Sequence, residues 1–327
     1  MASDKQMVVV GYGMGAWHSR LIDETEGLHL RGVCDILPAK RERALAEHPG
    51  IQTYDHIDKV LADAKVDVVV VVTPHNLHAP MAIASMNAGK HTITDKAMCL
   101  TVREAEAMIA ARDRNGVILS TFHNRRWDPE FLTVRHILED GALGRLYHIE
   151  SCVTSWGEIG GWRRNREEMG GWLFDWGAHL LDQILALAQS RATTVYALEH
   201  YRYGSPNTVE DYVECTVTFE SGLTARAVVG YLNKLPMPRW YILGEHGSLQ
   251  VDDFDRPVRM RLPVAGRDSD VTVPLLPGNW QSFYQNISDH FHRGADLAVT
   301  PEQIVPQIAI AEAAYRSIAK RQAIRLQ

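Results

Sequence analysis

One stretch near the start of the chain decides its fold: Met7-Val8-Val9-Val10-Gly11-Tyr12-Gly13-Met14-Gly15-Ala16-Trp17-His18. Its four leading apolar residues, three of them valines, predict a buried parallel strand. Three closely spaced glycines follow, and the residues from Trp17 onward can form a helix. A strand that enters a glycine turn and leaves as a helix points backbone N–H groups and the positive end of the helix dipole at the space above the turn. The stretch therefore predicts an anion-binding turn.

The glycine spacing departs from the dinucleotide pattern G-x-G-x-x-G at its last position. Ala16 stands there, unless one residue is missing before Gly15. Alanine is accepted at this position, whose role is close packing of the helix on the strand. Because tight turns also need glycine, the glycines alone are weak evidence for a nucleotide site.

An acidic residue at the end of the second strand strengthens the prediction. Dinucleotide-binding folds carry one about 20 residues after the glycines, and Asp35 closes the strand-like run that begins at Leu28. The alternative is that Asp35 only caps the helix expected over Pro38–His48. A carboxylate here accepts from both ribose hydroxyls of NAD and repels the 2′-phosphate of NADP, and Lys40 and Arg41 lie close enough to soften that preference. We expect NAD as the cofactor, with NADP possible.

Composition sets further bounds. The 327 residues suffice for two domains, and 46% hydrophobic and 23% charged residues are ordinary for a globular protein. A net charge of −6 gives no reason to expect a nucleic-acid or membrane partner. The longest apolar run, Val68–Val72, is too short to span a bilayer, and no signal-peptide pattern is present. Four scattered cysteines fit a reducing cytoplasm and indicate neither a disulfide framework nor a zinc site.

The order of the expected helices and strands changes near residue 123. Up to Thr121, apolar strands alternate with helices, which predicts a parallel sheet covered by helices. From Val195 to Val273 strands follow one another without helices, including a hairpin around Glu220-Ser221-Gly222. We therefore expect an α/β Rossmann dinucleotide-binding domain over residues 1–123. Residues 124–327 should form an α+β domain with a large, open, mainly antiparallel sheet, for substrate binding and oligomerisation.

Two stretches carry residues suited to chemistry. Lys96 follows a short strand at the nucleotide edge of the first sheet, and the apolar Met98-Cys99-Leu100 next to it suggests burial that would lower the lysine pKa. On a helix expected near Leu173–Leu187, Asp175 and His179 are four residues apart and share one face. A metal site is disfavoured because no further ligands accompany them. On spacing alone, a buried structural pair is the better interpretation.

The sequence resembles the glucose–fructose oxidoreductase/inositol dehydrogenase (Gfo/Idh/MocA) family over almost its whole length. The segments that carry the resemblance, besides the glycine turn, are Thr73–His78, Ala88–His91, the Lys96 segment, Asn124–Pro129, Trp162-Arg163, and Gly170-Gly171 through Asp175 and His179. Family members usually have Glu-Lys-Pro where this chain has Asp95-Lys96-Ala97. The lysine is kept, and loss of the proline could reshape the floor of the nicotinamide pocket.

The resemblance implies a set of site residues. Lys96, Asp175 and His179 would be the catalytic group, with His179 as base because the ordinary histidine pKa lies near working pH. Lys96 would stabilise the developing alkoxide. Lys96, Arg163, Asp175 and His179 would contact substrate, and no metal is expected. The expected cofactor-binding residues are Gly11, Tyr12, Gly13, Met14, Gly15, Asp35, Thr73, Pro74, Asn76, His78, Asp95, Lys96, Asn124, Trp162 and Arg163.

These expectations describe a cytoplasmic NAD(P)-dependent oxidoreductase that acts on a secondary hydroxyl of a sugar, sugar derivative or inositol. The resemblance also implies a homodimer or homotetramer, and the charge and apolar runs predict neither a membrane nor a nucleic-acid partner. One alternative is a glycosidase of the same family, in which tightly held NAD transiently oxidises the sugar. Another is a non-catalytic nucleotide-sensing protein, which retention of both Lys96 and His179 argues against.

Overall fold

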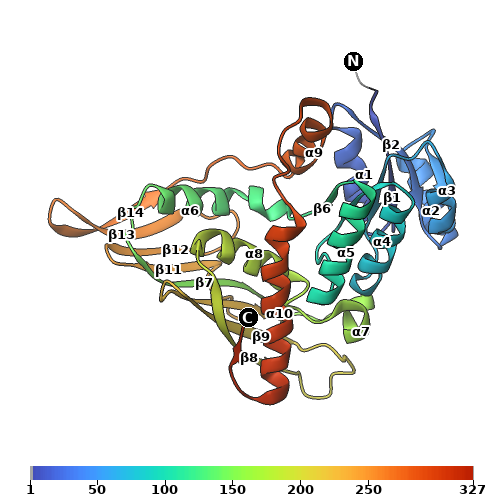
Figure 1. Ribbon diagram of the computed structural model, residues 1–327. Helices are drawn as coiled ribbons and strands as arrows, with labels where there is room; N and C mark the ends of the chain where they lie inside the picture. Colours follow the sequence, from blue (N-terminus) through green and yellow to red (C-terminus); the bar gives the residue numbers. More distant parts are fainter. Residues whose placement is uncertain (1–2, 327) are drawn as a thin grey trace. The chain divides into compact units, whose positions relative to one another are not determined.

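The structure is a computed structural model that describes residues 3–326. The chain forms two compact units. Unit 1 contains the chain up to His123 together with Gln281–Val305, and unit 2 contains Asn124–Trp280 and Pro306–Gln327. Figure 1 shows the elements of both units, coloured along the sequence.

Unit 1 is built on a six-stranded sheet with the order β3-β2-β1-β4-β5-β6, and every strand pairing in it is parallel. The predicted α/β dinucleotide-binding fold is thereby confirmed. The strands are β1 (Lys5–Val10), β2 (Leu28–Cys34), β3 (Gln52–Tyr54), β4 (Val68–Val71), β5 (His91–Thr94) and β6 (Leu119–Thr121). The helices are α1 (Gly15–Asp23), α2 (Pro38–Glu47), α3 (Ile57–Ala62), η1 (His75–Leu77, a 3-10 helix), α4 (His78–Asn87), α5 (Val102–Asn115) and α9 (Gln281–Arg293).

The strand order places the chain reversal between β1 and β4. In open parallel sheets, ligands bind outside the carboxyl ends of the strands at such a reversal. The glycine turn follows β1, and Thr73-Pro74 follows β4. Val8 and Val9 of β1 and the four valines of β4 are fully buried, so the two strands that carry these turns form the centre of the unit 1 core.

Local signals placed α5 accurately. The Thr101 hydroxyl accepts a hydrogen bond from the Glu104 amide, and the Glu104 carboxylate accepts one from the Thr101 amide, which together form a capping box. Gly116 ends the helix in the left-handed conformation, at φ 60°. Such caps are fixed by neighbouring residues, so the sequence alone predicts them well.

Helix α9 belongs to unit 1, although we assigned its residues to the second domain. Its attachment includes side chains that reach backbone carbonyls around the end of α1. Gln281 Nε2 donates to the Leu21 carbonyl at 2.8 Å, and Ser288 Oγ donates to the Glu26 carbonyl at 2.5 Å. These contacts join residues about 260 positions apart, and no local sequence pattern reports them.

Unit 2 is built on a nine-stranded sheet with the order β14-β13-β12-β11-β7-β10-β9-β8-β15. Among the described residues only the β7–β10 pairing is parallel, so the expectation of a mainly antiparallel sheet is confirmed. The strands are β7 (Leu146–Thr154), β8 (Ala192–His200), β9 (Tyr212–Phe219), β10 (Thr224–Gly230), β11 (Trp240–Gly244), β12 (Gly247–Val251), β13 (Val258–Val264), β14 (Arg267–Val273) and β15 (Ile324–Arg325). The helices are the 3-10 helix η2 (Asn124–Trp127), α6 (Pro129–Glu139), the 3-10 helix η3 (Gly161–Arg164), α7 (Arg166–Met169), α8 (Trp176–Ala188) and, from Pro306 onward, α10 (Pro301–Lys320).

Helices pack on one face of this sheet. Helix α8 lies along β7 and β10, and α6 contacts β13 (Figure 1). Along β9 the side chains alternate between half-buried and buried, with Val213, Cys215 and Val217 buried beneath the helices. The alternate residues lie on the opposite face, which stays open.

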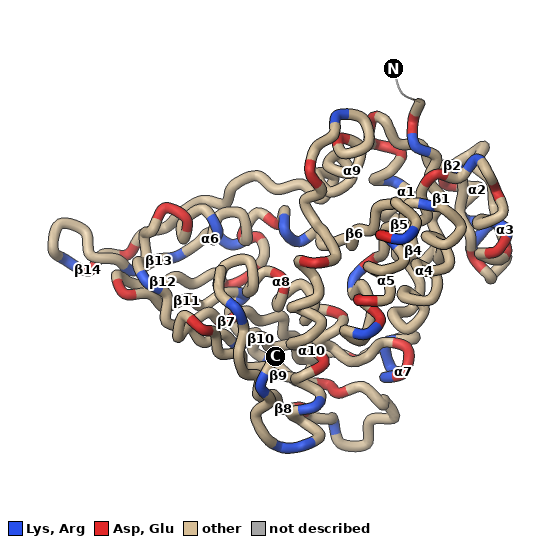
Figure 2. The backbone as a smooth tube through the Cα atoms, viewed as in Figure 1, with Lys and Arg blue, Asp and Glu red and all other residues tan. Residues whose placement is uncertain are grey.

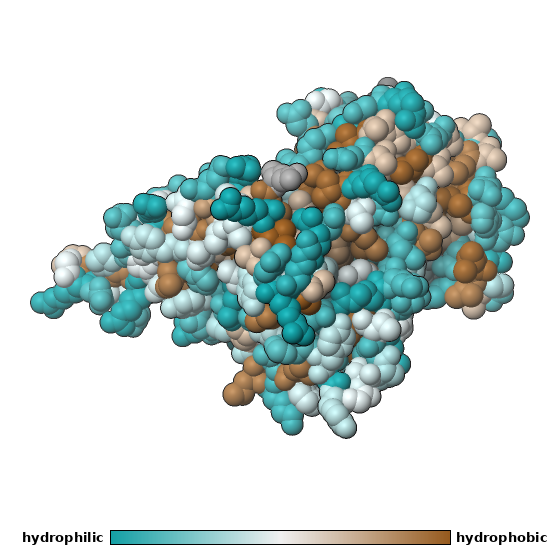
Figure 3. All heavy atoms as spheres, turned by 60° about the horizontal axis from the view of Figure 1, so that its bottom comes forward, coloured by the Kyte–Doolittle hydropathy of each residue, from teal (hydrophilic) through white to brown (hydrophobic). Residues whose placement is uncertain are grey.

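Charge and hydropathy are mixed over the surface. Figure 2 shows Lys and Arg interspersed with Asp and Glu in both units, and hydrophilic side chains cover much of the face in Figure 3. Among residues 3–326, no helix has the length and apolar character needed to cross a membrane. The four cysteines are free thiols, and all are buried. Burial raises the pKa of Cys34 and of Cys215 to about 12.

Candidate active site

The glycine turn after β1 is shaped for close approach. Gly11 has φ +97°, and a side chain there would collide with the Val72 carbonyl of the neighbouring strand end. A Cβ on Gly13 would meet no heavy atom within 4 Å, so space above the turn is open. A Cβ on Gly15 would lie 2.8 Å from Val9 Cγ1. Gly15, rather than Ala16, therefore takes the helix-packing role of the third glycine.

Asp35 connects this turn to the next one. Its Oδ2 accepts a hydrogen bond from the Tyr12 amide at 2.8 Å, and its Oδ1 accepts one from the Leu37 amide at 2.9 Å. Leu37, not Asp35, occupies the N-cap position of α2. The capping alternative for Asp35 is therefore wrong, since the carboxylate instead closes a turn before the helix. Arg41 donates to the Asp35 carbonyl at 2.7 Å, which places a cation beside the carboxylate.

These features fit a dinucleotide. The open space over Gly13, the glycine-only conformation of Gly11 and the start of α1 form a cradle for a pyrophosphate. Asp35 stands where the adenosine ribose is held in such folds. The Tyr12 side chain is turned away from this cradle, because its buried hydroxyl donates to Glu47 at 2.7 Å. Met14 is half exposed beside the turn.

The segments that follow β4 and β5 are tied together by His78. Its ring nitrogens lie 2.6 Å from the Ala97 carbonyl and 2.9 Å from the Thr73 carbonyl. The side chain is fully buried, and burial lowers its pKa although both carbonyls oppose that shift. His78, predicted to bind the cofactor, therefore holds the surrounding loops in place. Pro74 and Asn76 lie in the loop that it holds, and Asn76 is exposed.

Asp95 and Lys96 follow β5 directly. Asp95 Oδ1 accepts a hydrogen bond from the Lys96 amide at 2.8 Å and lies 3.8 Å from His18 Nε2. His18 Nδ1 is 2.7 Å from the hydroxyl of Tyr284 in α9. Burial alone would raise the pKa of Asp95, but His18, Lys96 and His78 together hold it well below its usual range. The Lys96–Ala97 peptide bond is cis.

Unit 2 contributes a second group around the start of α8. Asp175 occupies the N-cap position, with φ −96° and ψ −96°, rather than a place inside the helix as predicted. The helix starts later because the chain makes a tight turn over Gly171–Asp175, in which the Trp172 carbonyl accepts from the Asp175 amide at 3.2 Å. His179 lies in the first turn of α8, and both side chains are buried.

Arg163 completes this group. Its Nε donates to Asp175 Oδ2, and its guanidinium lies 4.7 Å from the centre of the Trp162 ring. The Trp176 ring centre lies 5.9 Å from that of His179, edge to face. The structure thus brings Trp162, Arg163 and Asp175 together and places His179 one helical turn beyond. Asn124, a predicted cofactor-binding residue, is buried at the start of η2.

One aromatic member of this group was not predicted from the sequence. Tyr231 follows β10, and its ring centre lies 4.6 Å from that of Trp172. Burial raises the pKa of Tyr231, and the charge of Arg163 opposes that shift. The parallel pairing of β10 with β7 carries Tyr231 there, and that pairing depends on long-range register.

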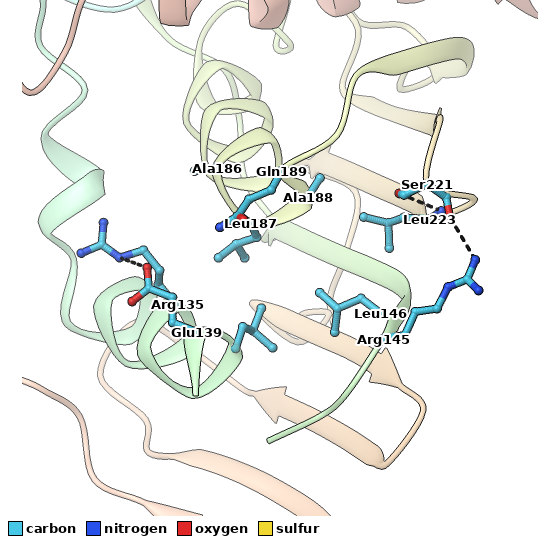
Figure 4. Close-up of a pocket in the computed structure, with 11 residues that line it drawn as sticks. Arg135, Glu139, Arg145, Leu146, Ala186, Leu187, Ala188, Gln189, Ser221 and Leu223 are labelled. Atoms are coloured by element: carbon cyan, nitrogen blue, oxygen red, sulfur yellow. Dashed lines mark hydrogen bonds and ion pairs between the residues drawn. The ribbon is translucent and has the colours of Figure 1, made fainter. Parts of the chain in front are cut away.

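Two other features bear on binding. A cavity of about 430 Å³ opens at the C-terminal ends of α6 and α8, lined by Arg135, Arg145, Leu187 and Gln189 among others (Figure 4). It lies at the opposite end of α8 from Asp175 and is separate from the candidate residues. Within residues 3–326, no three His, Cys, Asp or Glu side chains are grouped to hold a metal ion.

Family models match an N-terminal and a C-terminal part of the chain. Residues 5–123 match the oxidoreductase family with NAD-binding Rossmann fold, and residues 131–250 match the GFO/IDH/MocA C-terminal domain. An NAD-binding protein from Listeria innocua is 30% identical, with a TM-score of 0.92 and coverage of 99% of this chain and 100% of that chain.

Two named enzymes are similar over most of their length. The scyllo-inositol 2-dehydrogenase (NADP(+)) of Bacillus subtilis (strain 168) is 27% identical, covering 98% of this chain and 95% of its own. The 1,5-anhydro-D-fructose reductase of Ensifer adhaerens is 26% identical, covering 88% of this chain and 89% of its own.

Proposed function

Because the chain belongs to the GFO/IDH/MocA family of NAD(P)-dependent oxidoreductases, it is a dehydrogenase or reductase, and we propose that it acts on a secondary hydroxyl of a sugar, sugar derivative or cyclitol. The observation that carries the substrate class is the group at the start of α8. It combines a buried carboxylate, a guanidinium and a histidine with several aromatic rings. Aromatic faces suit the C–H faces of a polyol ring, and charged groups suit its hydroxyls. The two named relatives act on a cyclitol and on an anhydro-sugar.

Bound NAD(P) supplies the hydride acceptor or donor. We assign the remaining work to residues of the chain. The His179 imidazole takes the proton of the substrate hydroxyl during oxidation and returns it during reduction. The Lys96 ammonium stabilises the negative charge that develops on the substrate oxygen. Asp175, held by Arg163, accepts a hydrogen bond from a substrate hydroxyl and fixes the ring orientation.

For the cofactor, we propose a preference for NAD over NADP. The argument rests on Asp35, whose carboxylate lies beside the turn. Arg41, bonded to the Asp35 carbonyl, is the group that could attract a 2′-phosphate, and the Bacillus subtilis relative is named for NADP⁺. The two effects oppose each other, and direct titration measures which is larger.

We also propose that the chain forms a homo-oligomer through the open face of the unit 2 sheet. The register aligns one row of side chains straight across that face. The row is Tyr196, Thr216, Arg226, Glu150, Tyr241, Gln250, Arg259 and Thr272. None of these side chains is buried, and the two tyrosines flank an ion pair of 2.9 Å between Arg226 and Glu150.

A panel of cyclitols and sugars tests the proposal, starting with scyllo-inositol and 1,5-anhydro-D-fructose. Thermal-shift measurements with NAD⁺, NADH, NADP⁺ and NADPH identify ligands, and NAD(P)H absorbance then reports turnover. Net NAD(P)H formation or consumption with a polyol supports a dehydrogenase. Bond cleavage in a glycoside without net change in the cofactor would instead indicate the redox-assisted glycosidase. Binding without any chemistry across the panel would favour the sensor.

A further inference from the structure

Glu210 is a buried carboxylate to which the proposed reaction gives no role. It precedes β9 and is fully buried. Its Oε1 accepts hydrogen bonds from the Trp172 amide at 2.9 Å and from the Tyr315 hydroxyl at 2.6 Å, and its Oε2 accepts one from Arg166 Nη2 at 2.7 Å. Burial raises the pKa of Glu210, although Arg166 and the other donors oppose that shift. A buried carboxylate with three donors is a strong, directional anchor.

One of these contacts ends on the turn that precedes α8, and Tyr315 reaches the same turn. The Tyr315 hydroxyl, which comes from α10, also accepts the amide of Leu173 at 3.1 Å. Two consecutive amides of the turn, those of Trp172 and Leu173, are therefore held by Glu210 and Tyr315. The carbonyl of Trp172 in turn accepts from the amides of Asp175, at 3.2 Å, and Gly177, at 2.8 Å. The Trp172–Leu173 peptide unit thus connects Tyr315, which holds its N–H, to the first turn of α8, which donates to its carbonyl.

The fit around Tyr315 is tight. Gly171 has φ +113°, and a Cβ there would collide with the Tyr315 hydroxyl. The Phe174 ring stacks on the Tyr315 ring with centres 5.9 Å apart and an interplanar angle of 17°. The Arg166 guanidinium lies 4.8 Å from the centre of the Tyr315 ring. The Tyr315 side chain is therefore packed from several sides, and its hydroxyl leaves no room for a side chain on Gly171.

We propose that Glu210 and Tyr315 are positioning residues of the active site, an inference that rests on the function proposed above. They hold the turn whose last residue is Asp175, and the helix that starts there carries His179. Neither residue touches substrate. Their effect is to fix the placement of the carboxylate that Arg163 binds and of the imidazole one helical turn later. Misplacement of such groups by about 1 Å can lower turnover by as much as about 100-fold.

Tyr315→Phe tests this with a matched control on the same helix. Ser317 is also a buried hydroxyl of α10 that accepts one amide, from Ala197 at 3.2 Å, and donates to one carbonyl, of Gln322 at 2.7 Å. Its contacts lead to β8 and to the chain end rather than to the turn. Ser317→Ala and Tyr315→Phe therefore remove chemically similar hydrogen bonds at two destinations. Glu210→Gln adds a conservative variant that keeps one acceptor oxygen and removes the charge facing Arg166.

The first measurement is amide hydrogen exchange, which needs no substrate. In Tyr315→Phe, exchange at Leu173 should quicken by roughly 5-fold, the effect of losing one hydrogen bond, while Ser317→Ala should leave it unchanged. The second is turnover of the compound found in the panel. It should fall on the order of 10-fold in Tyr315→Phe, with NAD(P)H affinity unchanged, because the cofactor cradle belongs to unit 1. The turnover of Glu210→Gln should lie between that of Tyr315→Phe and that of the unmodified chain.

Three results would overturn the inference: unchanged exchange at Leu173 in Tyr315→Phe, faster exchange without loss of turnover, or an equal loss of turnover in Ser317→Ala. Each leaves the proposed function in place. Absence of polyol chemistry in the unmodified chain would instead refute the proposed function. In that case hydrogen exchange of the 170–179 segment is measured with NAD⁺ and each panel compound. The protection that a ligand gives this segment must be lost in Tyr315→Phe and kept in Ser317→Ala. Any other result means that the inference fails too.

Discussion

Some residues that match a cofactor-binding motif also hold the local backbone in place. Asp35 fits the ribose position of a dinucleotide fold, and its carboxylate also accepts the Tyr12 and Leu37 amides. Replacing it therefore changes both specificity and turn geometry. His78, by contrast, matches the same set of expected cofactor residues but is used entirely between two carbonyls.

Asp35→Ser should narrow the affinity ratio between NAD and NADP. Serine removes the charge that repels a 2′-phosphate and keeps an oxygen that can accept the Tyr12 amide. Arg41 then remains as the nearby cation. Titration of both reduced cofactors by fluorescence measures the ratio before and after the change. Equal affinities, or NADP favoured, in the unmodified chain would contradict the proposed preference. Turnover at saturating cofactor is the control and should change little.

His179→Ala should lower turnover about 10²–10⁴-fold while NAD(P)H still binds, because general-base catalysis is lost and the cofactor cradle is in the other unit. A purely structural histidine would behave differently, lowering the melting temperature and leaving turnover per folded molecule nearly intact. Turnover and melting temperature are therefore measured together. Lys96→Ala is the comparison: because it follows β5 in unit 1, we expect it to lower turnover and weaken the cofactor complex as well.

Among the helices and strands, bounds that neighbouring residues fix could be predicted from the sequence, and bounds that long-range contacts fix could not. The α5 caps and the β9–β10 hairpin both follow from residues close in sequence, and the hairpin was predicted. The start of α8 was not, because the Gly171–Asp175 turn is held by Tyr315, 142 residues from Leu173. For the same reason the spacing of Asp175 and His179 predicted that Asp175 lies inside a helix. In the structure Asp175 occupies the N-cap position of α8 and accepts a hydrogen bond from Arg163.

A buried ion pair between elements gives a pH prediction. Glu130 of α6 lies 3.4 Å from Arg239, which precedes β11, and its carboxyl oxygens accept no hydrogen bond from the described residues. Burial raises the pKa of Glu130 to about 7, although Arg239 opposes that shift. In the unfolded chain the carboxyl would ionise near pH 4.5. Stability from this group is therefore fully present below the unfolded pKa near 4.5 and is lost as pH rises through the raised pKa of the folded state.

Glu130→Gln should flatten the dependence of melting temperature on pH across this window. The glutamine is neutral at every pH, so its folded and unfolded forms bind protons equally there. Thermal unfolding at several pH values between 4.5 and 8 measures the difference from the unmodified chain. Glu139→Gln, an exposed change on the same helix, is the control and should leave the slope unchanged. Parallel curves for Glu130→Gln and the unmodified chain would show that Glu130 is ionised throughout.

At the scale of the whole molecule, the unit 2 sheet has one face without helices. In β8, Tyr196 and Leu198 are 41% and 40% exposed, while Val195 and Ala197, which alternate with them, are buried. Large apolar side chains at regular spacing on an open sheet are unusual for a free surface. The sequence predicted this sheet from strand succession alone, and only the register shows that its exposed residues line up into one row.

We expect the chain to form a symmetric homo-oligomer through this face. A two-fold axis would bring the row of one copy against that of the next, so a single charged substitution is repeated at the interface. Tyr241→Lys places a new cation in the row, beside the tyrosine's neighbours Glu150 and Gln250. Light scattering at micromolar concentration should show a dimer or tetramer for the unmodified chain and a smaller species for Tyr241→Lys. Tyr203→Lys, a fully exposed loop tyrosine outside the sheet, is the control and should leave the mass unchanged. A monomeric unmodified chain, or loss of assembly only in Tyr203→Lys, would place the interface elsewhere or remove it.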